Sequence, residues 1–256
     1  MTEIRGIYTL WLREIKRYLR DRARIISSFV QPLLWLVIFG SGIRFSQTQV
    51  GNLTPQQYLF PGIVGQTLLF TSMFMGISVI WDREFGFLKE ILVAPISRFS
   101  VFIGKMLGDS TDAVIQGIIV FVLALFLGIP LDLSAFLEAL PIMILITFGL
   151  VGIGLTVASF IESLESFGVI QSFINLPLFF LSGALFPIRG IDVPNWLQIA
   201  SSLNPLTYGV DALRTVILGN AWQPYIYEPL YFDLLVVVCF DALMIAVGTW
   251  AFSRRK

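Results

Sequence analysis

Long apolar runs dominate the hydropathy pattern of this chain, and its polar residues gather in the segments between those runs. A helix needs roughly 20 residues to cross about 30 Å of hydrocarbon. Six runs reach this length, at residues 25–43, 58–81, 106–129, 139–161, 166–186 and 232–252. The pattern therefore predicts an all-α integral membrane protein whose six transmembrane helices form a single domain over residues 1–256.

Residues 1–24, ahead of the first run, have a different pattern. At about 100° per residue, the apolar side chains of residues 4–20 share one face of a helix and the bases occupy the opposite face. The apolar face contains Ile4, Ile7, Tyr8, Trp11, Ile15, Tyr18 and Leu19. Such a helix lies in the headgroup plane of a membrane. It is either an anchor helix without a partner or a helix that contacts one.

The loop over residues 82–105 mixes charged and apolar residues. Acidic and basic side chains alternate with Phe and Leu between Glu84 and Leu92, which predicts a short amphipathic helix that Pro95 ends. This helix is either a docking element for a partner or a second interfacial helix.

The segment over residues 187–231 is too long for a simple connection. Asn204 followed by Pro205 is typical of a helix start, and this helix is predicted to continue to Leu218 and to end at Gly219. A second short helix is predicted after Pro194. The two helices either dip into the outer leaflet or form a cap on the surface.

Positively charged residues are distributed unevenly between the two sides that the six helices define. Of the 17 Lys and Arg residues, fourteen fall in the N-terminal segment, in the loop after the second run and in the C-terminal tail, against three on the other side. Because cytoplasmic loops carry the excess of Lys and Arg, both termini are predicted to be cytoplasmic. The protein is therefore expected in the cell membrane, as a multi-pass protein of an inner or plasma membrane.

Composition excludes several functions. Hydrophobic residues make up 56% of the chain and charged residues 13%, with 17 bases balanced by 17 acids, so no basic surplus exists to bind nucleic acid. The absence of His and the single Cys239 exclude a His-based triad, the usual zinc site and an internal disulfide. No phosphate-binding G-x-x-x-x-G-K-[ST] loop is present, so the chain is not expected to be an enzyme that hydrolyses nucleotides.

Several polar residues fall inside the predicted spans. Spacings of three and four residues place Lys105, Asp109, Asp112 and Gln116 on one face of the third helix. Because polar groups are costly in hydrocarbon, this face is expected to contact protein or water and not lipid. Asp241 lies near the middle of the sixth span, and Asn175 in the fifth is a candidate partner. The stripe is either a structural polar seam or a path for an ion or substrate. Small residues at Gly104-x-x-x-Gly108 allow a close helix approach.

Two segments resemble the membrane subunits of ABC-2 type exporters, a family that includes antibiotic-resistance, polysaccharide and Nod-factor permeases. They are REFGFLKEILVAPISRFSVFIGK at residues 83–105 and LSGALFPIRGIDVPNWLQIASSLNPLTYGVDALR at residues 181–214. The resemblance implies a coupling helix that docks on a separate ATPase, formed here by Glu84, Phe85, Gly86, Leu88, Lys89, Glu90 and Leu92, with Glu162 and Glu165 as a second contact. It also implies an external gate shaped by Gly183, Pro187, Trp196, Asn204, Pro205 and Arg214. Lys89 departs from the family, in which an acidic residue is frequent at this position.

The resemblance further implies two permease copies paired with two ATPase subunits, which bind the ATP and Mg. The cargo would be a hydrophobic or amphipathic compound, a glycolipid or a polysaccharide, moved out of the cytoplasm. The main alternative is a proton-coupled secondary transporter that uses Asp241 with Asp109 and Asp112, and it predicts transport without any ATPase. A membrane-embedded lipid-modifying enzyme is a third interpretation, which the lack of His and the scattered acidic residues disfavour.

Overall fold

The computed structural model describes residues 2–22, 25–26, 30, 32–35, 37–38, 53–93, 95–186, 188 and 193–254. Every regular element in this part of the chain is helical, so the all-α prediction is confirmed. The α-helices are α1 (Thr2–Arg20), α3 (Pro55–Met75), α4 (Ile77–Glu84), α5 (Phe87–Val93), α6 (Arg98–Phe126), α7 (Leu133–Phe160), α8 (Leu164–Phe180), α9 (Asn195–Ser202), α10 (Pro205–Leu218) and α11 (Leu230–Arg254). Two 3₁₀ turns, η2 (Gly219–Ala221) and η3 (Gln223–Tyr225), join α10 to α11.

Within the described residues, four helical segments are long and apolar enough to cross a membrane: α3 continued by α4, α6, α7 and α11. Helix α8 has 17 residues and is therefore about 26 Å long, slightly less than the hydrocarbon thickness. The predicted first span, residues 25–43, falls largely outside the described residues. The described residues thus form a helical bundle with four candidate membrane spans, and the count of six spans stays a prediction.

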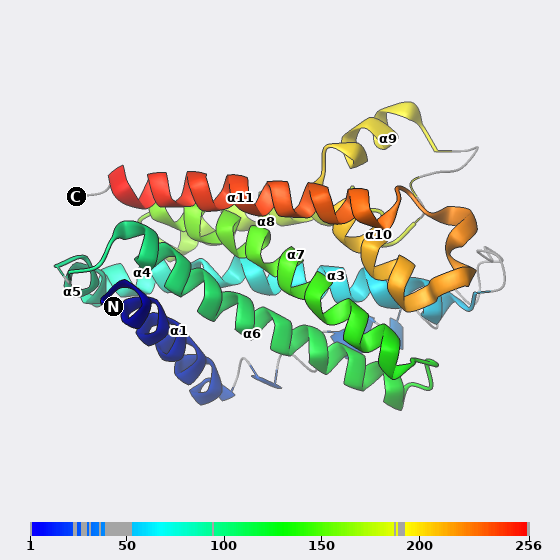
Figure 1. Ribbon diagram of the computed structural model, residues 1–256, viewed down its shortest axis with the longest axis horizontal. Coiled ribbons are helices and arrows are strands. Elements are labelled where there is room, and N and C mark those ends of the chain that lie inside the picture. The colour runs from blue at the N-terminus through cyan, green and yellow to red at the C-terminus, as the bar shows by residue number, and fades with distance from the viewer. Residues whose placement is uncertain are drawn as a thin grey trace.

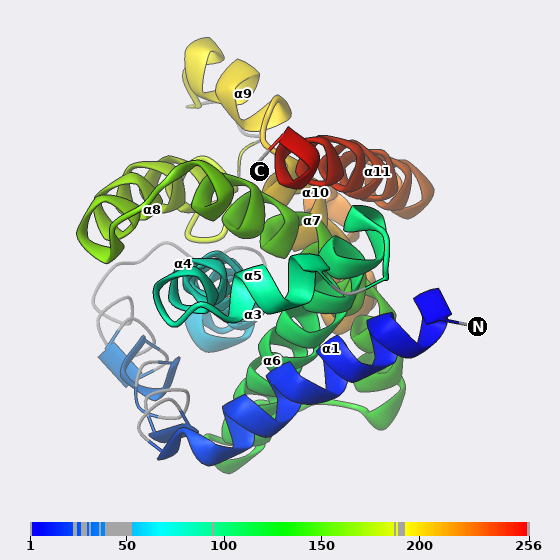
Figure 2. The same cartoon turned by 90° about the vertical axis from the view of Figure 1, so that its left-hand side faces the viewer.

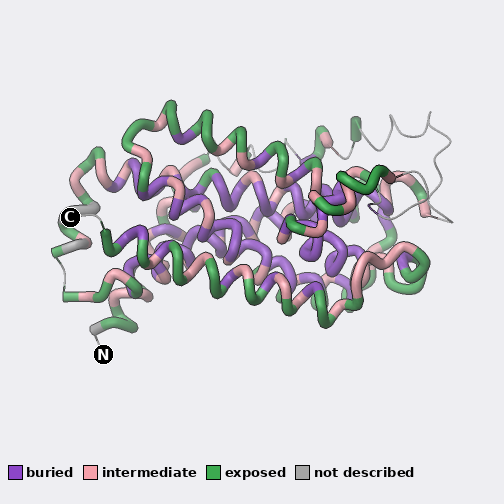
Figure 3. Tube along the Cα trace, turned by 90° about the horizontal axis from the view of Figure 1, so that it is seen from above, coloured by how far each residue is buried: buried purple, intermediate pink, exposed green. Residues whose placement is uncertain are grey.

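The long helices lie side by side, with α7 packed against α3, α6, α10 and α11 (Figures 1 and 2). Helix α1 crosses α6 at an angle (Figure 2). Buried residues line the inner sides of the helices along the whole length of the bundle (Figure 3). The core includes Phe60 and Leu68 of α3, Met143 of α7 and Val210 of α10, each without exposed surface. These side chains form a closely packed apolar centre.

Caps and turns shift several helix ends from their predicted positions. Helix α6 begins at Arg98, ahead of the predicted residue 106, because the Ser97 hydroxyl caps it by accepting a hydrogen bond from the Ser100 N–H at 3.2 Å. Helix α8 ends at Phe180, ahead of the predicted residue 186, and a turn containing Gly183 at φ +72° follows. The Asn204 cap, the Pro205 start and the Gly219 end of α10 are confirmed.

The amphipathic segment after the second long helix also differs from the prediction, which placed one helix over residues 84–92. Glu84 ends α4, and the chain turns at Gly86, where φ is +80°, before α5 begins at Phe87. A φ in this region is available to glycine at little cost. The start of α1, the end of α11 and α5 lie at one end of the bundle, whereas α9 and the turns η2 and η3 lie toward the other end (Figure 1).

Candidate functional site

A buried lysine joins three helices at the end of the bundle that carries α5. Lys105 of α6 has no exposed surface, and its Nζ lies 2.7 Å from Asp82 Oδ2 of α4 and 3.0 Å from Glu14 Oε1 of α1. The same Nζ donates a hydrogen bond to the Ser78 hydroxyl at 3.2 Å. We call Lys105, Asp82, Glu14 and Ser78 the Lys105 cluster. Because both carboxylates are also buried, they compensate the buried charge of Lys105, and it compensates theirs.

Two arginines of α1 extend the cluster toward α5. Arg13 donates to Asp82, and its guanidinium lies 5.6 Å from the ring centroid of Phe87 in α5. Partial burial favours the neutral form of Arg13, but the adjacent Asp82 carboxylate outweighs it and raises the pKa of Arg13 above its ordinary value. Arg17 stacks on Trp81, 4.6 Å from its ring centroid. Helix α1 is thereby fastened to both ends of the α4–α5 turn.

Glycines let α1 approach α6 closely enough for these contacts. A Cβ on Gly104 would lie 2.9 Å from Leu10 Cβ, and one on Gly108 would lie 2.6 Å from Glu14 Cβ. Trp11 Nε1 donates to the Thr111 hydroxyl at 3.1 Å farther along the same contact. The Gly104-x-x-x-Gly108 pattern therefore serves the packing of α1 on α6 within one chain.

Arg83, the residue after Asp82, holds the other side of α4. Its guanidinium donates to the carbonyl of Ile161 at 2.7 Å and to that of Ser159 at 3.3 Å, at the end of α7. These are carbonyls that the end of a helix leaves without an intrahelical partner. The exposed Glu162 and Glu165, predicted as a second partner contact, follow in the α7–α8 connection and in the first turn of α8. Arg83 thus ties the two predicted docking segments together.

The predicted coupling residues lie at the tip of this end of the bundle. Glu84 and Phe85 are exposed, the latter with 71% of its surface accessible, and Gly86 forms the turn into α5. The remaining predicted coupling residues of this segment belong to α5: Leu88, Lys89, Glu90 and Leu92. Among these, Glu90 has an exposed side chain. The tip therefore presents acidic and aromatic groups to solvent.

The polar stripe of α6 continues inward from the Lys105 cluster. Asp109 Oδ2 accepts from the Ser78 hydroxyl at 3.4 Å, and Gln116 Oε1 accepts from the Thr71 hydroxyl at 2.8 Å. The side chain of Asp112 is 1% exposed. The described part of the stripe faces α3 and α4, because Thr71 belongs to α3 and Ser78 to α4.

Asp241 and Asn175 are both buried, on α11 and α8. A Cβ on Gly149 of α7 would lie 2.6 Å from Asp241 Oδ1, so the missing side chain of that glycine makes room for the carboxyl group. Within the described part of the chain no hydrogen bond joins Asn175 to Asp241. The predicted pairing of Asn175 with Asp241 is therefore not formed, and Asp241 packs against Gly149 of α7 instead.

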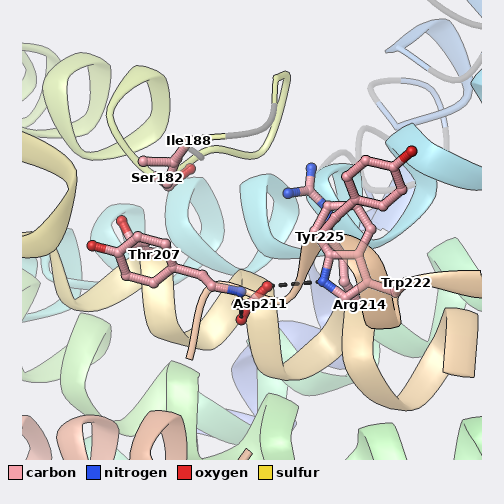
Figure 4. A pocket seen from close by; sticks show the side chains of 8 residues that line it. Ser182, Ile188, Thr207, Asp211, Arg214, Trp222 and Tyr225 are labelled. Carbon is pink, nitrogen blue, oxygen red and sulfur yellow. Dashed lines mark hydrogen bonds between the residues drawn. The ribbon is translucent and has the colours of Figure 1, made fainter. Parts of the chain in front are cut away.

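At the opposite end, Asp211 of α10 fastens the connection to α11 (Figure 4). Its Oδ1 accepts from Trp222 Nε1 at 2.9 Å, and its Oδ2 accepts from the backbone N–H groups of Tyr227 at 2.8 Å and Glu228 at 3.1 Å. Burial raises the pKa of the Asp211 carboxyl above its ordinary value, although these three donors act in the opposite direction. One carboxyl group thus holds both 3₁₀ turns against α10.

Arg214, one turn farther along α10, is stacked between two rings. Its guanidinium lies 4.6 Å from the ring centroid of Tyr58 and 4.9 Å from that of Trp222, and it donates to the carbonyl of Ala184 at 2.8 Å. This carbonyl follows Gly183, one of the predicted gate residues. Arg214 therefore links α3, α10 and the turn after α8.

The other predicted gate residues surround the same region. Asn204 caps α10 through its Oδ1 and donates from Nδ2 to the carbonyl of Leu178 at 2.7 Å, with Pro205 in the first turn. Trp196 of α9 is 66% exposed, and α9 stands away from the bundle (Figure 1). Pro187 lies outside the described residues.

The sequence did not single out Glu14, Arg83 or Asp211 as interaction partners. A signal exists for Glu14, because it is an acidic residue spaced with Ile7, Leu10 and Tyr18 along one side of a basic helix. No comparable pattern marks Arg83, whose partners are backbone carbonyls from a distant part of the chain.

Comparisons with known proteins place the chain in a family. The model of the ABC-2 type transporter family matches residues 5–218. A protein of Cyanophora paradoxa named as a transport permease, ycf38, is 31% identical over 250 residues, which cover 93% of this chain and 86% of that protein. Nodulation protein J of Rhizobium meliloti is 25% identical, with coverage of 91% and 87%. The inner membrane transport permease YadH of Escherichia coli K12 is 23% identical, with coverage of 98% and 95%.

Proposed function

Since this chain belongs to the ABC-2 type transporter family, we propose that it is the permease subunit of an exporter driven by a separate ATPase. Its relatives are transport permeases, so its function is transport across a membrane. Permeases of this family normally work with an ATPase subunit. In our proposal two copies of the chain pair with two ATPase subunits, which bind the ATP and Mg, and both termini face the cytoplasm.

The consecutive residues Asp82 and Arg83 carry the proposal. They occupy the last turn of α4, immediately ahead of α5, and their side chains contact different helices. Asp82 contacts Lys105 of α6 and Arg13 of α1, whereas Arg83 contacts the end of α7. A force applied to α5 by an ATPase would therefore reach three helices through side chains that are already in contact.

The contact with the ATPase is assigned to the exposed tip of this end. Glu84 and Glu90 supply negative charge there, and Phe85 supplies apolar surface. Glu162 and Glu165 lie next to this tip, close to the end of α7 that Arg83 contacts. Closure of two ATPase subunits would move these segments together and shift the dimer between inward-facing and outward-facing arrangements.

The other end of the bundle is assigned to the gate. Arg214, Asn204 and Asp211 hold the turn after α8, the α10 start and the α10–α11 connection in one packed unit. A hydrophobic or amphipathic compound, a glycolipid or a polysaccharide is the proposed cargo, and α9 with its exposed Trp196 is proposed to enter the outer leaflet.

The proposal is tested by reversing charge at the tip in the reconstituted complex of permease and ATPase. We expect the double substitution Glu84→Lys and Glu90→Lys to leave expression unchanged and to abolish most transport per ATP hydrolysed. Glu138→Lys is the matched control, because Glu138 is an exposed acidic residue of α7 near the opposite end of the bundle. Normal coupled transport in the double variant would reject the docking role of α5.

The same assay separates this function from proton-coupled transport. The structure engages Asp109 with Ser78 beside the Lys105 cluster, which favours a structural role for that carboxylate. A proton-coupled carrier predicts uphill transport by the permease alone and its loss in Asp241→Asn. Our proposal predicts no uphill transport without the ATPase, whichever residue stands at position 241.

A further inference from the structure

Helix α1 presents three different surfaces. One of them packs on α6 and is buried: Leu10, Glu14 and Tyr18 are 6%, 2% and 2% exposed. The second is apolar and open, with Ile4, Tyr8 and Leu19 exposed over 75%, 56% and 61% of their surface. An open apolar stripe along a whole helix is costly in water, because each side chain keeps its unfavourable contact with solvent.

The third surface is cationic and adjoins the apolar stripe. At about 100° per residue, Arg5, Lys16 and Arg20 fall within an arc of about 60° that begins beside the stripe. All three are exposed, and none has an ion-pair partner in the described part of the chain. Arg13, by contrast, is partly buried and binds Asp82. The bases of α1 are thus divided between an internal network and an outward face.

We propose that this outward face of α1 binds anionic phospholipid headgroups. The stripe of Ile4, Tyr8 and Leu19 would enter the acyl region, while Arg5, Lys16 and Arg20 contact the headgroup phosphates. A helix with bases next to an apolar face takes this position in a membrane. The inference goes beyond the transport function and does not depend on the ATPase.

Three observations favour lipid over a protein as the occupant. Helix α1 packs on α6, which is long and apolar enough to cross a bilayer, so a helix in this position is within reach of the membrane surface. The three bases carry a positive charge that complements an anionic headgroup. The acidic Glu3 of the same helix is engaged elsewhere, because its carboxylate accepts from the Ser97 N–H and hydroxyl at 3.0 Å.

Lipid selectivity of the purified full-length chain tests the inference. The chain is placed in phosphatidylcholine bilayers, and its association with spin-labelled phosphatidylglycerol is compared with that of spin-labelled phosphatidylcholine. Each base near a membrane surface is worth about a fivefold preference for anionic lipid. We expect a preference of about fivefold or more at low ionic strength, which falls as salt shortens the screening length.

The variant R5Q/K16Q/R20Q removes the three charges, and Gln maintains helix propensity. Its preference is expected to fall close to one. The matched variant R5K/K16R/R20K keeps all three charges and is expected to keep the preference. Because these measurements contain no ATPase, their outcome is independent of the exporter proposal.

Two results would overturn the inference. One is an absence of selectivity, or a selectivity without salt dependence, in the unaltered chain. The other is a preference that survives in R5Q/K16Q/R20Q, since the anionic lipid would then bind elsewhere. If that variant does not fold, the salt titration of the unaltered chain and the charge-preserving variant decide the question. A last outcome would assign this face of α1 to a protein partner instead. In that case R5Q/K16Q/R20Q in pure phosphatidylcholine would no longer bind the ATPase subunit, while its lipid selectivity would be unchanged.

Discussion

Replacing Lys105 by Met separates the electrostatic role of the Lys105 cluster from its packing role. Met has a similar length and no charge, so the packing of the side chain is largely retained. The carboxylates of Asp82 and Glu14 lose the cation that lies 2.7 and 3.0 Å away, although both remain 2% exposed. Asp82 keeps Arg13, but the nearest cation left to the buried Glu14 is Arg17 at 3.7 Å, so its charge is only partly compensated.

The expected cost follows from this charge balance. Removing one partner of a buried ion pair costs about 3–5 kcal/mol. For a chain of this size each kcal/mol lowers the melting temperature by about 2–4 °C, which gives a decrease of about 6–20 °C. A second substitution, Glu14→Gln, restores the balance, because Asp82 keeps its contact with Arg13. The double variant K105M/E14Q should recover most of the lost stability.

The assay is thermal unfolding of the purified chain in lipid nanodiscs for the unaltered protein, K105M, E14Q and K105M/E14Q. The double-mutant cycle gives the interaction energy between Lys105 and Glu14. We expect the double variant to be more stable than K105M. Additive effects, with an interaction energy below about 0.5 kcal/mol, would refute the view that these two charges depend on each other.

Two further predictions concern helix packing and pH. Gly108→Leu should lower stability by about 1–3 kcal/mol, because its side chain meets Glu14 on α1, whereas Gly168→Ala, with nothing within 4 Å, should be neutral or slightly stabilising in the same thermal assay. The raised pKa of Asp211 means that the folded state binds its proton more tightly than the unfolded state, so this residue's contribution to stability falls as the pH rises through the window above the ordinary value of 3.8. The melting temperature of the unaltered chain, measured in the same thermal assay, should fall across that window. The melting temperature should lose this pH dependence in Asp211→Asn. An unchanged pH profile in that variant would count against the role of Asp211.

The sequence predicted those parts of the fold that depend on local chemistry. The start of α10 was readable because Asn204 and Pro205 fit an N-cap and a first turn, and Gly219 fits the end. The apolar runs located the long helices for a similar reason, since lipid demands continuous hydrocarbon-compatible residues. The family was also readable, because its motifs lie in two continuous segments.

Contacts between distant segments were not readable in the same way. The pairing of Lys105 with Glu14 joins residues 91 positions apart and requires the orientation of α1 on α6, which the hydropathy pattern does not fix. The contact of Arg83 with Ile161 spans 78 positions and ends on a backbone carbonyl, which every residue possesses. The end of α8 was misplaced because the residues after Phe180 are as apolar as the helix itself, so hydropathy does not mark the turn.

The adjacency of Asp82 and Arg83 limits where this part of the chain can change in length. Neighbouring residues on a helix point about 100° apart, and this angle directs one side chain toward α6 and the other toward α7. An additional residue earlier in α4 would rotate both away from their partners at once. An additional residue next to Gly86, whose surroundings are open, would leave both in register. We therefore expect an insertion on the α5 side of this pair to preserve the contacts of Asp82 and Arg83, and an insertion on the other side to break them.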